Sequence, residues 1–448
     1  MNLTTLEPLL AGTLGRSQLP LPRTAIEEWQ LQRLRTQLGY CRERSPFYRR
    51  HLQGVDPGAI QALQDIAALP PITEAELRAH GPAMVCVNQD AVARIITLHS
   101  SGTTGTPKRL FFTTGDLEQT RKFFHLGMQQ MVDPGQSVAI LLPGATPDST
   151  GHLLARALER MQVSSHIIGL VTQPEEAARA LARLRPDVLV GFPVQILAIA
   201  RMAEFLRLSL GKVRSVLLCS DYIPDSLRTE LQALLGCEIF THYGTTETGL
   251  GGGVDCAAHC GCHLRETDLL FEIINPMTAQ PLADGQWGEI VFTTLTRTGM
   301  PLIRYRTGDF GRLLTGACPC GSSIRRLDRV LGRRELIRSL RNGSRLAMAD
   351  LDERLFPIPG LLDFKACLTM ENGQNTLHLE LTTLPGRGER VSSLVIEVLT
   401  NHTQFQGVAL SLTLTSGTTI HPAKRILKDH REENHDEKTD PTNLHQPG

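Results

Sequence analysis

The sequence of 448 residues lacks a net charge, a long apolar segment and an internal repeat. Its 46 basic side chains balance its 46 acidic ones, which argues against a strong overall field that would attract nucleic acid or an anionic membrane. No apolar run reaches the length of a membrane-spanning helix. The first residues, MNLTTLEPLLAGTLG, lack the basic start and apolar centre of a secretory signal peptide. We therefore expect a cytoplasmic protein that binds neither nucleic acid nor membrane.

The composition is typical of a large globular protein. Hydrophobic residues make up 41% of the chain and charged residues 21%, an ordinary balance for domains with buried cores. The length suggests two or three such domains. In a reducing cytoplasm we expect the ten cysteines to be free thiols or metal ligands rather than disulfides.

Strands and helices are expected to alternate through the middle of the chain. The apolar segments that predict strands are Val138–Leu142, His166–Leu170, Val188–Val190, Ser215–Cys219 and Glu238–Thr241. The amphipathic segments between them that predict helices include Thr150–Met161, Pro174–Leu184 and Ser226–Leu235. This alternation indicates βαβ units, and therefore an α/β fold with a mainly parallel sheet.

The two ends of the chain differ from this pattern. Residues 26–52 are rich in helix formers and arginine, which predicts surface helices. Thr73, followed three residues later by Glu76, predicts a capping box at the start of another helix. From Leu269 onward shorter strands and turns are expected. The polar residues 431–448 are expected to be disordered.

The segment LHSSGTTGTPKRLFF, from Leu98 to Phe112, combines glycines, hydroxyl side chains and a lysine. It lies between two apolar runs, Ile95–Leu98 and Leu110–Phe112, that predict strands. Backbone N–H groups, hydroxyls and a lysine can surround phosphate oxygens, and glycine allows close approach. A Walker loop runs into a helix, and Lys108 does not fit its spacing. We interpret the segment as a phosphate-binding loop of another kind, with an unliganded polar hairpin loop as the alternative.

Two further segments carry carboxylates near strand ends. Glu247 follows a strand that ends near Thr241, and it lies beside Thr245 and Thr246. A carboxylate and hydroxyls at the carboxyl end of a parallel strand suit a magnesium ion carried on phosphates. Asp309 is expected in a turn after a strand, where its carboxylate can accept hydrogen bonds from the two hydroxyls of a ribose. For each segment the alternative is a loop carboxylate without a ligand.

Two clusters of cysteine and histidine have the spacing of metal sites. The seven candidate ligands are Cys256, His259, Cys260, Cys262, His263, Cys318 and Cys320. Soft ligands in two clusters far apart in the sequence are typical of a tetrahedral structural zinc site. Seven candidates compete for four positions, so the residues alone leave the ligand set open. The remaining cysteines, which stand singly and which we expect to be buried as small hydrophobic residues, are Cys41, Cys86, Cys219, Cys237 and Cys367.

Taken in this order and spacing, the motifs resemble those of the adenylate-forming superfamily. The segments Ser100–Lys108, Tyr243–Glu247 and Arg306–Asp309 match its three best-known motifs. Segments such as ERSPFYRRHL, ALPPITEAELR and CPCGS resemble the phenylacetate–CoA ligase-like branch in particular. The resemblance extends from Gln32 to Arg333 and fades beyond it.

The resemblance implies a reaction in two steps. The carboxylate of an acid attacks the α-phosphate of ATP, which forms an acyl-adenylate and pyrophosphate, and a thiol then displaces AMP. By carry-over, the β- and γ-phosphates would be bound by Ser101, Gly102, Thr103, Thr104, Gly105 and Lys108. Adenine would lie between two segments, Ser220–Asp221–Tyr222 and Thr241–His242–Tyr243.

The remaining roles also follow from the resemblance. Thr246 would contact the α-phosphate and Glu247 would hold magnesium. Asp309 would bind the ribose hydroxyls, with support from Arg333. Stabilising the charge on the phosphates in the transition state is chiefly electrostatic preorganisation.

The resemblance further implies a zinc ligand set. In the related ligases a Cys-x6-His unit joins a later Cys-x-Cys pair. That register selects Cys256, His263, Cys318 and Cys320. Cys260 and Cys262 are extra thiols relative to it, and either could displace one of the four. The site would be structural, because the phosphate motifs lie elsewhere.

The implied architecture has two domains. The large N-terminal domain, residues 1–331, would hold mainly parallel sheets flanked by helices and would include the zinc subsite within residues 256–320. A small mobile α+β domain would occupy residues 332–430 and act as a lid, followed by the tail at 431–448.

In the superfamily the small domain carries a lysine that reaches the carboxylate during adenylation. The related ligases have Gly-Lys immediately before the segment that matches Ala423-Lys424-Arg425. Here His421-Pro422 stands in that place. Lys424 is therefore the predicted substitute, with Lys428 second. The alternative is that both are ordinary surface lysines.

Three functions fit these observations. The first is a ligase that joins an aryl or similar carboxylic acid to CoA, with ATP, magnesium and structural zinc. The second is an adenylating enzyme that passes the acyl group to a carrier-protein thiol or a partner enzyme. The third is a zinc-stabilised homologue that keeps the nucleotide pocket without catalysis. The intact phosphate, magnesium and ribose motifs favour an enzyme. The sequence names neither the acid nor the oligomeric state, and a homodimer remains open.

Overall fold

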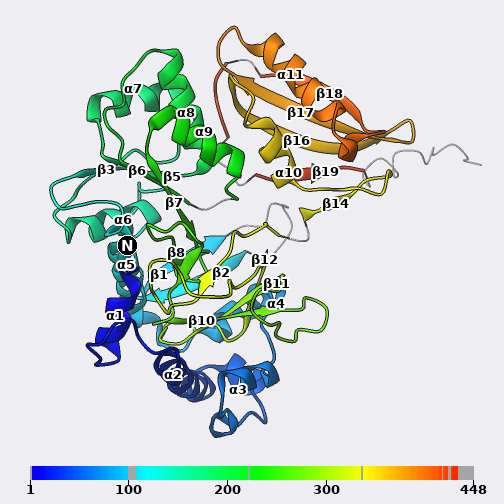
Figure 1. Ribbon diagram of the computed structural model, residues 1–448. Helices are drawn as coiled ribbons and strands as arrows, with labels where there is room; N and C mark the ends of the chain where they lie inside the picture. The colour runs from blue at the N-terminus through cyan, green and yellow to red at the C-terminus, as the bar shows by residue number, and fades with distance from the viewer. Residues whose placement is uncertain are drawn as a thin grey trace, which may run out of the picture.

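The computed structural model describes residues 3–98, 107–219, 222–333, 336–415, 417–421 and 425–431. The polar tail predicted to be disordered lies almost wholly outside these residues. A group of helices begins the chain (Figure 1): α1 (Leu6–Thr13), α2 (Arg23–Arg44), α3 (Pro46–His51) and α4 (Glu74–His80). The predicted capping box starts α4, since Thr73 Oγ1 accepts from the Glu76 N–H and the Glu76 carboxylate accepts from the Thr73 N–H.

An eight-stranded sheet forms the centre of the larger part of the chain, in the order β13-β9-β8-β7-β6-β5-β3-β4. Its parallel strands are β3 (Ser137–Leu141), β4 (Ser164–Ile167), β5 (Val188–Gly191), β6 (Ser215–Leu218) and β7 (Glu238–Tyr243). Its antiparallel strands are β8 (Gly253–Val254), β9 (Cys262–Leu264) and β13 (Arg326–Leu327). The predicted α/β fold with a mainly parallel sheet is confirmed. One strand was placed too late in the sequence, because β4 ends at Ile167 rather than at Leu170.

Helices cover both faces of this sheet. They are α5 (Thr114–Met128), α6 (Thr150–Glu159), α7 (Pro174–Leu184), α8 (Pro193–Phe205) and α9 (Asp225–Leu235). Successive side chains of a strand point to opposite faces, and β3 shows how this divides the core. Val138 and Ile140 pack in one cluster with residues of α1, α5 and α6. Ala139 and Leu141 pack in another with residues of α7, α8 and α9.

Two smaller sheets complete the larger part. The hairpin pairs β1 (Val92–Leu98) with β2 (Lys108–Thr113), which confirms the strand–loop–strand setting of the glycine-rich segment. The other sheet has the order β10-β11-β12 and consists of β10 (Leu269–Ile274), β11 (Gly288–Thr294) and β12 (Tyr305–Gly311). Asp309 therefore lies within a strand, and the expected turn after a strand was wrong. The glycines of the RTGDFG sequence predict a turn. In the structure Gly308 instead lies within β12, with a φ of 75°.

The C-terminal part forms a separate α+β arrangement. Its four-stranded sheet has the order β18-β17-β16-β19. Its helices are α10 (Met348–Leu355) and α11 (Gly388–Thr400), and its strands are β14 (Arg338–Ser339), β15 (Arg345–Leu346), β16 (Leu361–Glu371), β17 (Gln374–Thr383), β18 (Ala409–Leu414) and β19 (Leu427–Asp429). Short 3₁₀ helices occur at Pro57–Ala59, Leu63–Ala68, Gly81–Met84, Gln89–Ala91 and Thr403–Phe405. Within the described residues, no helix combines the length and the apolar character that crossing a membrane requires.

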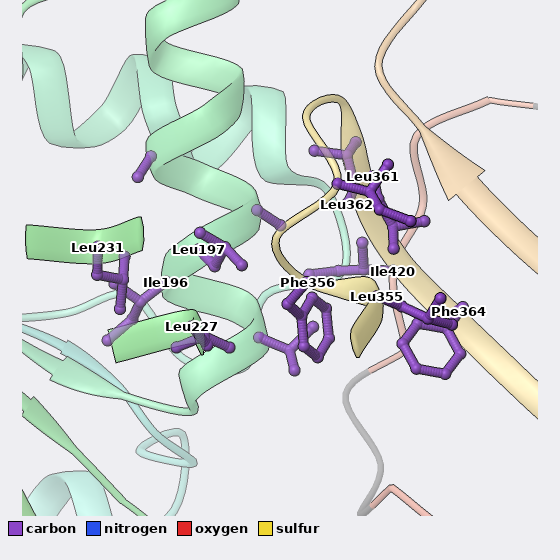
Figure 2. Close-up of a cluster of buried hydrophobic side chains, with 14 of the residues drawn as sticks. Ile196, Leu197, Leu227, Leu231, Leu355, Phe356, Leu361, Leu362, Phe364 and Ile420 are labelled. Atoms are coloured by element: carbon purple, nitrogen blue, oxygen red, sulfur yellow. The ribbon is translucent and has the colours of Figure 1, made fainter. Parts of the chain in front are cut away.

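The C-terminal sheet packs against α8 and α9 through buried apolar side chains (Figure 2). Leu197 and Leu227 face Phe356 and Leu361 across this contact. The buried guanidinium of Arg201 on α8 donates to the backbone carbonyls of Leu361 and Phe356. Burial of these groups stabilises this one placement of the C-terminal part beside the central sheet.

Candidate functional site

A cavity of about 550 Å³ lies where the ends of the central sheet, β12 and the C-terminal part meet. Its walls include residues from all three regions, among them Thr241, Tyr243, Asp309, Arg333, Met348 and Asp352. Ligands of α/β proteins bind at the carboxyl ends of parallel strands, and Tyr243 is the last residue of β7. The cavity is therefore placed where the motifs of the sequence predict a ligand.

Lys108 and Glu247 form a buried ion pair outside the lining of this cavity. Lys108 is the first residue of β2, and its ammonium contacts the carboxylate of Glu247, with both side chains 5% exposed. The Tyr305 hydroxyl donates to Glu247 Oε1 at 3.3 Å, and Arg297 donates to its backbone carbonyl at 2.6 Å. Burial alone would raise the pKa of Glu247, but the Lys108 charge and the hydrogen bonds to the Glu247 carboxylate together outweigh it, and the net shift is downward. Glu247 is thus a buried, charged carboxylate.

The wall of the cavity includes a group of side chains built around Asp309. The Tyr243 hydroxyl donates to Asp309 Oδ2 at 3.2 Å, and Arg333 Nε lies 3.6 Å from Asp309 Oδ1. A backbone bridge also joins Asp309 to Arg333. Burial and the neighbouring Asp309 charge raise the pKa of the Tyr243 phenol, so it stays a hydrogen-bond donor. These contacts hold the carboxylate of Asp309 at the cavity wall.

Glu74 joins the buried Lys108–Glu247 pair to the group around Asp309, and sequence reasoning missed it. Its carboxylate lies 3.6 Å from Lys108 Nζ through Oε1 and 3.3 Å from Arg333 through Oε2. The sequence shows Glu74 as an ordinary first-turn acid of α4, four residues before its partner Arg78. Arg333 is 259 residues away in sequence, so no local pattern could have revealed their contact.

The residues predicted to lie around adenine are only partly brought together. Thr241 and His242 line the cavity with Tyr243. Thr241 Oγ1 lies 3.5 Å from the Cys262 sulfur. Among the described residues, neither ring nitrogen of His242 has a hydrogen-bond partner although both are buried, and burial lowers the pKa of this imidazole to about 4. Thr246 is half-buried next to Glu247.

Several predicted site residues lie outside the described part of the chain. They are Ser101, Gly102, Thr103, Thr104, Gly105, Ser220, Asp221 and Lys424. Tyr222, which follows two of them, lines the cavity and donates to Glu353 at 2.7 Å. Lys428 is exposed on β19, where it pairs with Cys367 in the sheet. The roles predicted for these residues stay predictions.

A second cluster brings four of the seven Cys and His candidates together. They are Cys256, His263, Cys318 and Cys320, all buried, with ligand atoms within 4.8 Å of one another. The sulfurs of Cys256 and Cys318 are 3.8 Å apart, and His263 Nε2 lies 3.4 Å from the Cys320 sulfur. Tetrahedral zinc with sulfur ligands at about 2.3 Å separates those sulfurs by about 3.8 Å.

The surroundings of this cluster match the needs of a metal ligand set. His263 Nδ1 lies 3.3 Å from the Ile324 carbonyl, which orients the ring and leaves Nε2 free to face the thiols. Burial lowers the pKa of His263 to about 4, so its imidazole is neutral. Three thiols and a neutral imidazole fit a closed tetrahedral site.

The other three candidates make different contacts. His259 lies between Asp255 and Glu238, at 2.9 Å from each carboxylate. The Cys260 sulfur contacts the Ala258 carbonyl, and Cys262 faces Thr241. Four of the single cysteines are buried as expected: Cys41, Cys86, Cys219 and Cys237. Cys367 is half-buried, because it lies on the face of β16 opposite to that of the buried Ala366 and Leu368.

Comparison with known proteins matches the chain to one enzyme family. The sequence profile of the family described as AMP-binding enzyme matches residues 43–296. A phenylacetate–coenzyme A ligase of Thermus thermophilus is 31% identical over 329 residues, covering 70% of this chain and 71% of the relative. A phenylacetate–coenzyme A ligase of Escherichia coli is 30% identical over the same length, covering 70% and 73%.

The fold also matches a solved structure. A 2-hydroxyisobutyryl-CoA ligase in its postadenylation state superimposes with a TM-score of 0.76. The match covers 92% of this chain and 90% of the other, at 19% sequence identity. The shared fold thus extends across the central sheet and the C-terminal part.

Proposed function

Because the chain belongs to the AMP-binding enzymes, in the phenylacetate–CoA ligase-like branch, we infer that it is an AMP-forming acid–thiol ligase. It activates a carboxylic acid with ATP to an acyl-adenylate and pyrophosphate. It then transfers the acyl group to the thiol of CoA and releases AMP. The relatives named above are phenylacetate ligases, so an aryl or similar acid is the proposed substrate class.

The observation that carries this proposal is a line of charged groups that begins at the cavity wall with Asp309 and Arg333 and ends at the buried Lys108–Glu247 pair. The Lys108 and Glu247 pair offers a cation for phosphates beside a carboxylate for magnesium. The Asp309 and Tyr243 pair offers a fixed acceptor for a diol. Glu74 and Arg333 connect the two pairs. A nucleoside triphosphate carries the complementary groups in the same order.

The individual roles that we propose are those that the resemblance to the family implies. Lys108, with the loop of Ser101 to Gly105 before it, binds the β- and γ-phosphates. Thr246 contacts the α-phosphate, and Glu247 holds magnesium, which when bound neutralises phosphate charge. Asp309 accepts from the ribose hydroxyls with support from Arg333. Fixed charges of this kind lower the barrier because they need no reorganisation during the reaction.

Adenine is proposed to lie beside the end of β7. Thr241, His242 and Tyr243 form one side, and Ser220, Asp221 and Tyr222 form the other. Lys424 supplies the positive charge that approaches the carboxylate and the α-phosphate during adenylation. Residues 332–430 act as the mobile lid that carries it, and residues 1–331 hold the nucleotide.

We also propose that Cys256, His263, Cys318 and Cys320 bind a structural zinc ion. The support is their convergence and the neutral state of His263. Burial raises the pKa of Cys256, so the thiols need a cation to become thiolates. A zinc ion there ties the loop after β8 to the segment before β13, which stiffens one side of the cavity.

One experiment separates CoA from the other acceptors. The purified protein is incubated with ATP, magnesium, CoA and a panel of aryl and small carboxylic acids, and the products are identified by mass spectrometry. A ligase yields AMP, pyrophosphate and an acyl-CoA. Acyl-adenylate without acyl-CoA would instead favour transfer to a carrier protein or partner enzyme, and absence of any adenylate would favour a non-catalytic homologue.

A further inference from the structure

The carboxylate of Glu74 lies among three positive side chains. Arg78 NH2 is 2.5 Å from Oε1, Lys108 Nζ is 3.6 Å from Oε1, and Arg333 NH1 is 3.3 Å from Oε2. Burial alone would raise the pKa of Glu74, but these three charges outweigh it and the net shift is downward. Glu74 is therefore an anion at neutral pH.

These contacts form a chain of charges that begins at the cavity wall with Asp309 and Arg333. Glu247 contacts Lys108, Lys108 lies near Glu74, Glu74 contacts Arg333, and Arg333 lies near Asp309. In this series of contacts, Glu74 is the carboxylate that lies between the two cations assigned to the nucleotide, Lys108 and Arg333. Without a nucleotide, its carboxylate offers Lys108 a partner that phosphate oxygens would otherwise provide, and it contacts Arg333 at the same time.

We propose that Glu74 is a positioning residue. Its carboxylate holds Lys108 and Arg333 before ATP binds, and the triphosphate then displaces this carboxylate from Lys108. The inference rests on the proposed function, because it takes Lys108 as the ligand of the β- and γ-phosphates. The ammonium of Lys108 carries three N–H donors. Glu247 remains in contact with it, so the weaker contact at 3.6 Å to Glu74 is the one that a phosphate replaces.

This arrangement has two opposite effects on the nucleotide. It keeps the lysine and the arginine ordered, which lowers the entropy lost on binding. It also places a negative charge next to the arriving phosphates, which weakens their binding by repulsion. The repulsion acts on the triphosphate and not on the nucleoside. Without the Glu74 charge, Lys108 still contacts Glu247 and Arg333 still lies near Asp309, so most of the ordering is kept while the repulsion is lost. Removing the charge of Glu74 should therefore tighten ATP and leave adenosine unchanged.

The test compares ATP with adenosine in three proteins. Binding is measured by calorimetry with magnesium but without acid or CoA, so that no turnover occurs. Glu74→Gln should lower the Kd of ATP about fivefold, the scale of one partly exposed charge contact, and leave the Kd of adenosine at its wild-type value. Glu74→Ser removes the same charge and should give the same result. It serves as the test if the glutamine variant fails to fold.

Glu76→Gln is the matched control. It removes one charge from the same helix, two residues away, but the Glu76 carboxylate caps α4 through Thr73 instead of facing the cations. Both affinities should stay at wild-type values in this variant. An equal or weaker ATP affinity in the Glu74 variants would overturn the proposal, as would an equal tightening of ATP and adenosine. Failure of wild type to bind ATP would reject the proposed function itself.

Discussion

The buried pair of Lys108 and Glu247 should separate stability from catalysis. Glu247→Gln keeps the size of the side chain but removes its charge, which leaves the ammonium of Lys108 in a site that is 5% exposed. Removing one partner of a buried ion pair costs about 3 to 5 kcal/mol. We expect about 3 kcal/mol, because Glu74 still lies 3.6 Å from the ammonium.

The opposite single variant should cost more. Lys108→Met leaves the Glu247 carboxylate with neutral side-chain donors, the Tyr305 hydroxyl at 3.3 Å and the Thr245 hydroxyl. We expect a loss of about 4 kcal/mol, since no other cation contacts that carboxylate among the described residues. The double variant replaces the pair with neutral groups of similar volume, so its unfolding free energy should lie within about 1 kcal/mol of wild type.

Activity should not follow stability in this series. Carboxylate-dependent ATP–pyrophosphate exchange measures adenylation alone, and urea unfolding measures stability without nucleotide. All three variants should lose about a hundredfold or more in exchange, the scale of one strong electrostatic contact in the transition state. Near-normal exchange in Glu247→Gln would remove Glu247 from the mechanism. A double variant as unstable as both single variants combined would show that the two side chains do not act as a pair.

The remaining predictions concern zinc, the C-terminal lysine and pH. Cys318→Ser should abolish the binding of about one zinc per chain and lower the unfolding free energy, while Cys260→Ala should retain the metal. Elemental analysis that finds zinc in the Cys318→Ser variant would reject the site. Lys424→Ala should slow acyl-adenylate formation about a hundredfold and leave the thiol step from preformed adenylate near normal. Lys428→Ala should leave both steps nearly intact. Equal slowing of both steps by Lys424→Ala would indicate a folding defect. Burial lowers the pKa of His242 from 6.5 to about 4. Between these pH values the unfolded chain therefore binds more protons than the folded chain. The unfolding free energy should fall by up to about 3 kcal/mol as pH decreases from 6.5 to 4. Urea unfolding of His242→Leu should show a smaller decrease over that range, and an identical pH dependence would contradict the assignment.

Local sequence determined much of the fold. Alternating apolar and amphipathic segments predicted the parallel strands and their helices, because the periodicity of side chains along a strand or helix is a local property. The helix Pro174–Leu184 was predicted with the bounds that the structure has. The capping box at Thr73 was likewise readable, since its two partners are three residues apart. Strand ends were less certain, as β4 shows.

The sequence also indicated which residues carry chemistry, through motifs of glycine, hydroxyl and carboxylate groups. It could not show that Asp309 lies inside a strand, because the glycines beside it are equally common in turns. It left seven candidates for the metal cluster. Four of them meet only because β9 pairs with β13, which brings His263 beside the segment that holds Cys318 and Cys320.

Tertiary structure alone decided the electrostatics of the cavity. Glu247 is charged although it is buried, since the fold places Lys108 against it. Glu74 joins Lys108 to Arg333 across 259 residues of sequence. Such contacts depend on how helix α4, strand β2 and the end of the larger part pack together. Charge interactions act through space, so the local sequence around a residue does not predict which distant charges lie near it.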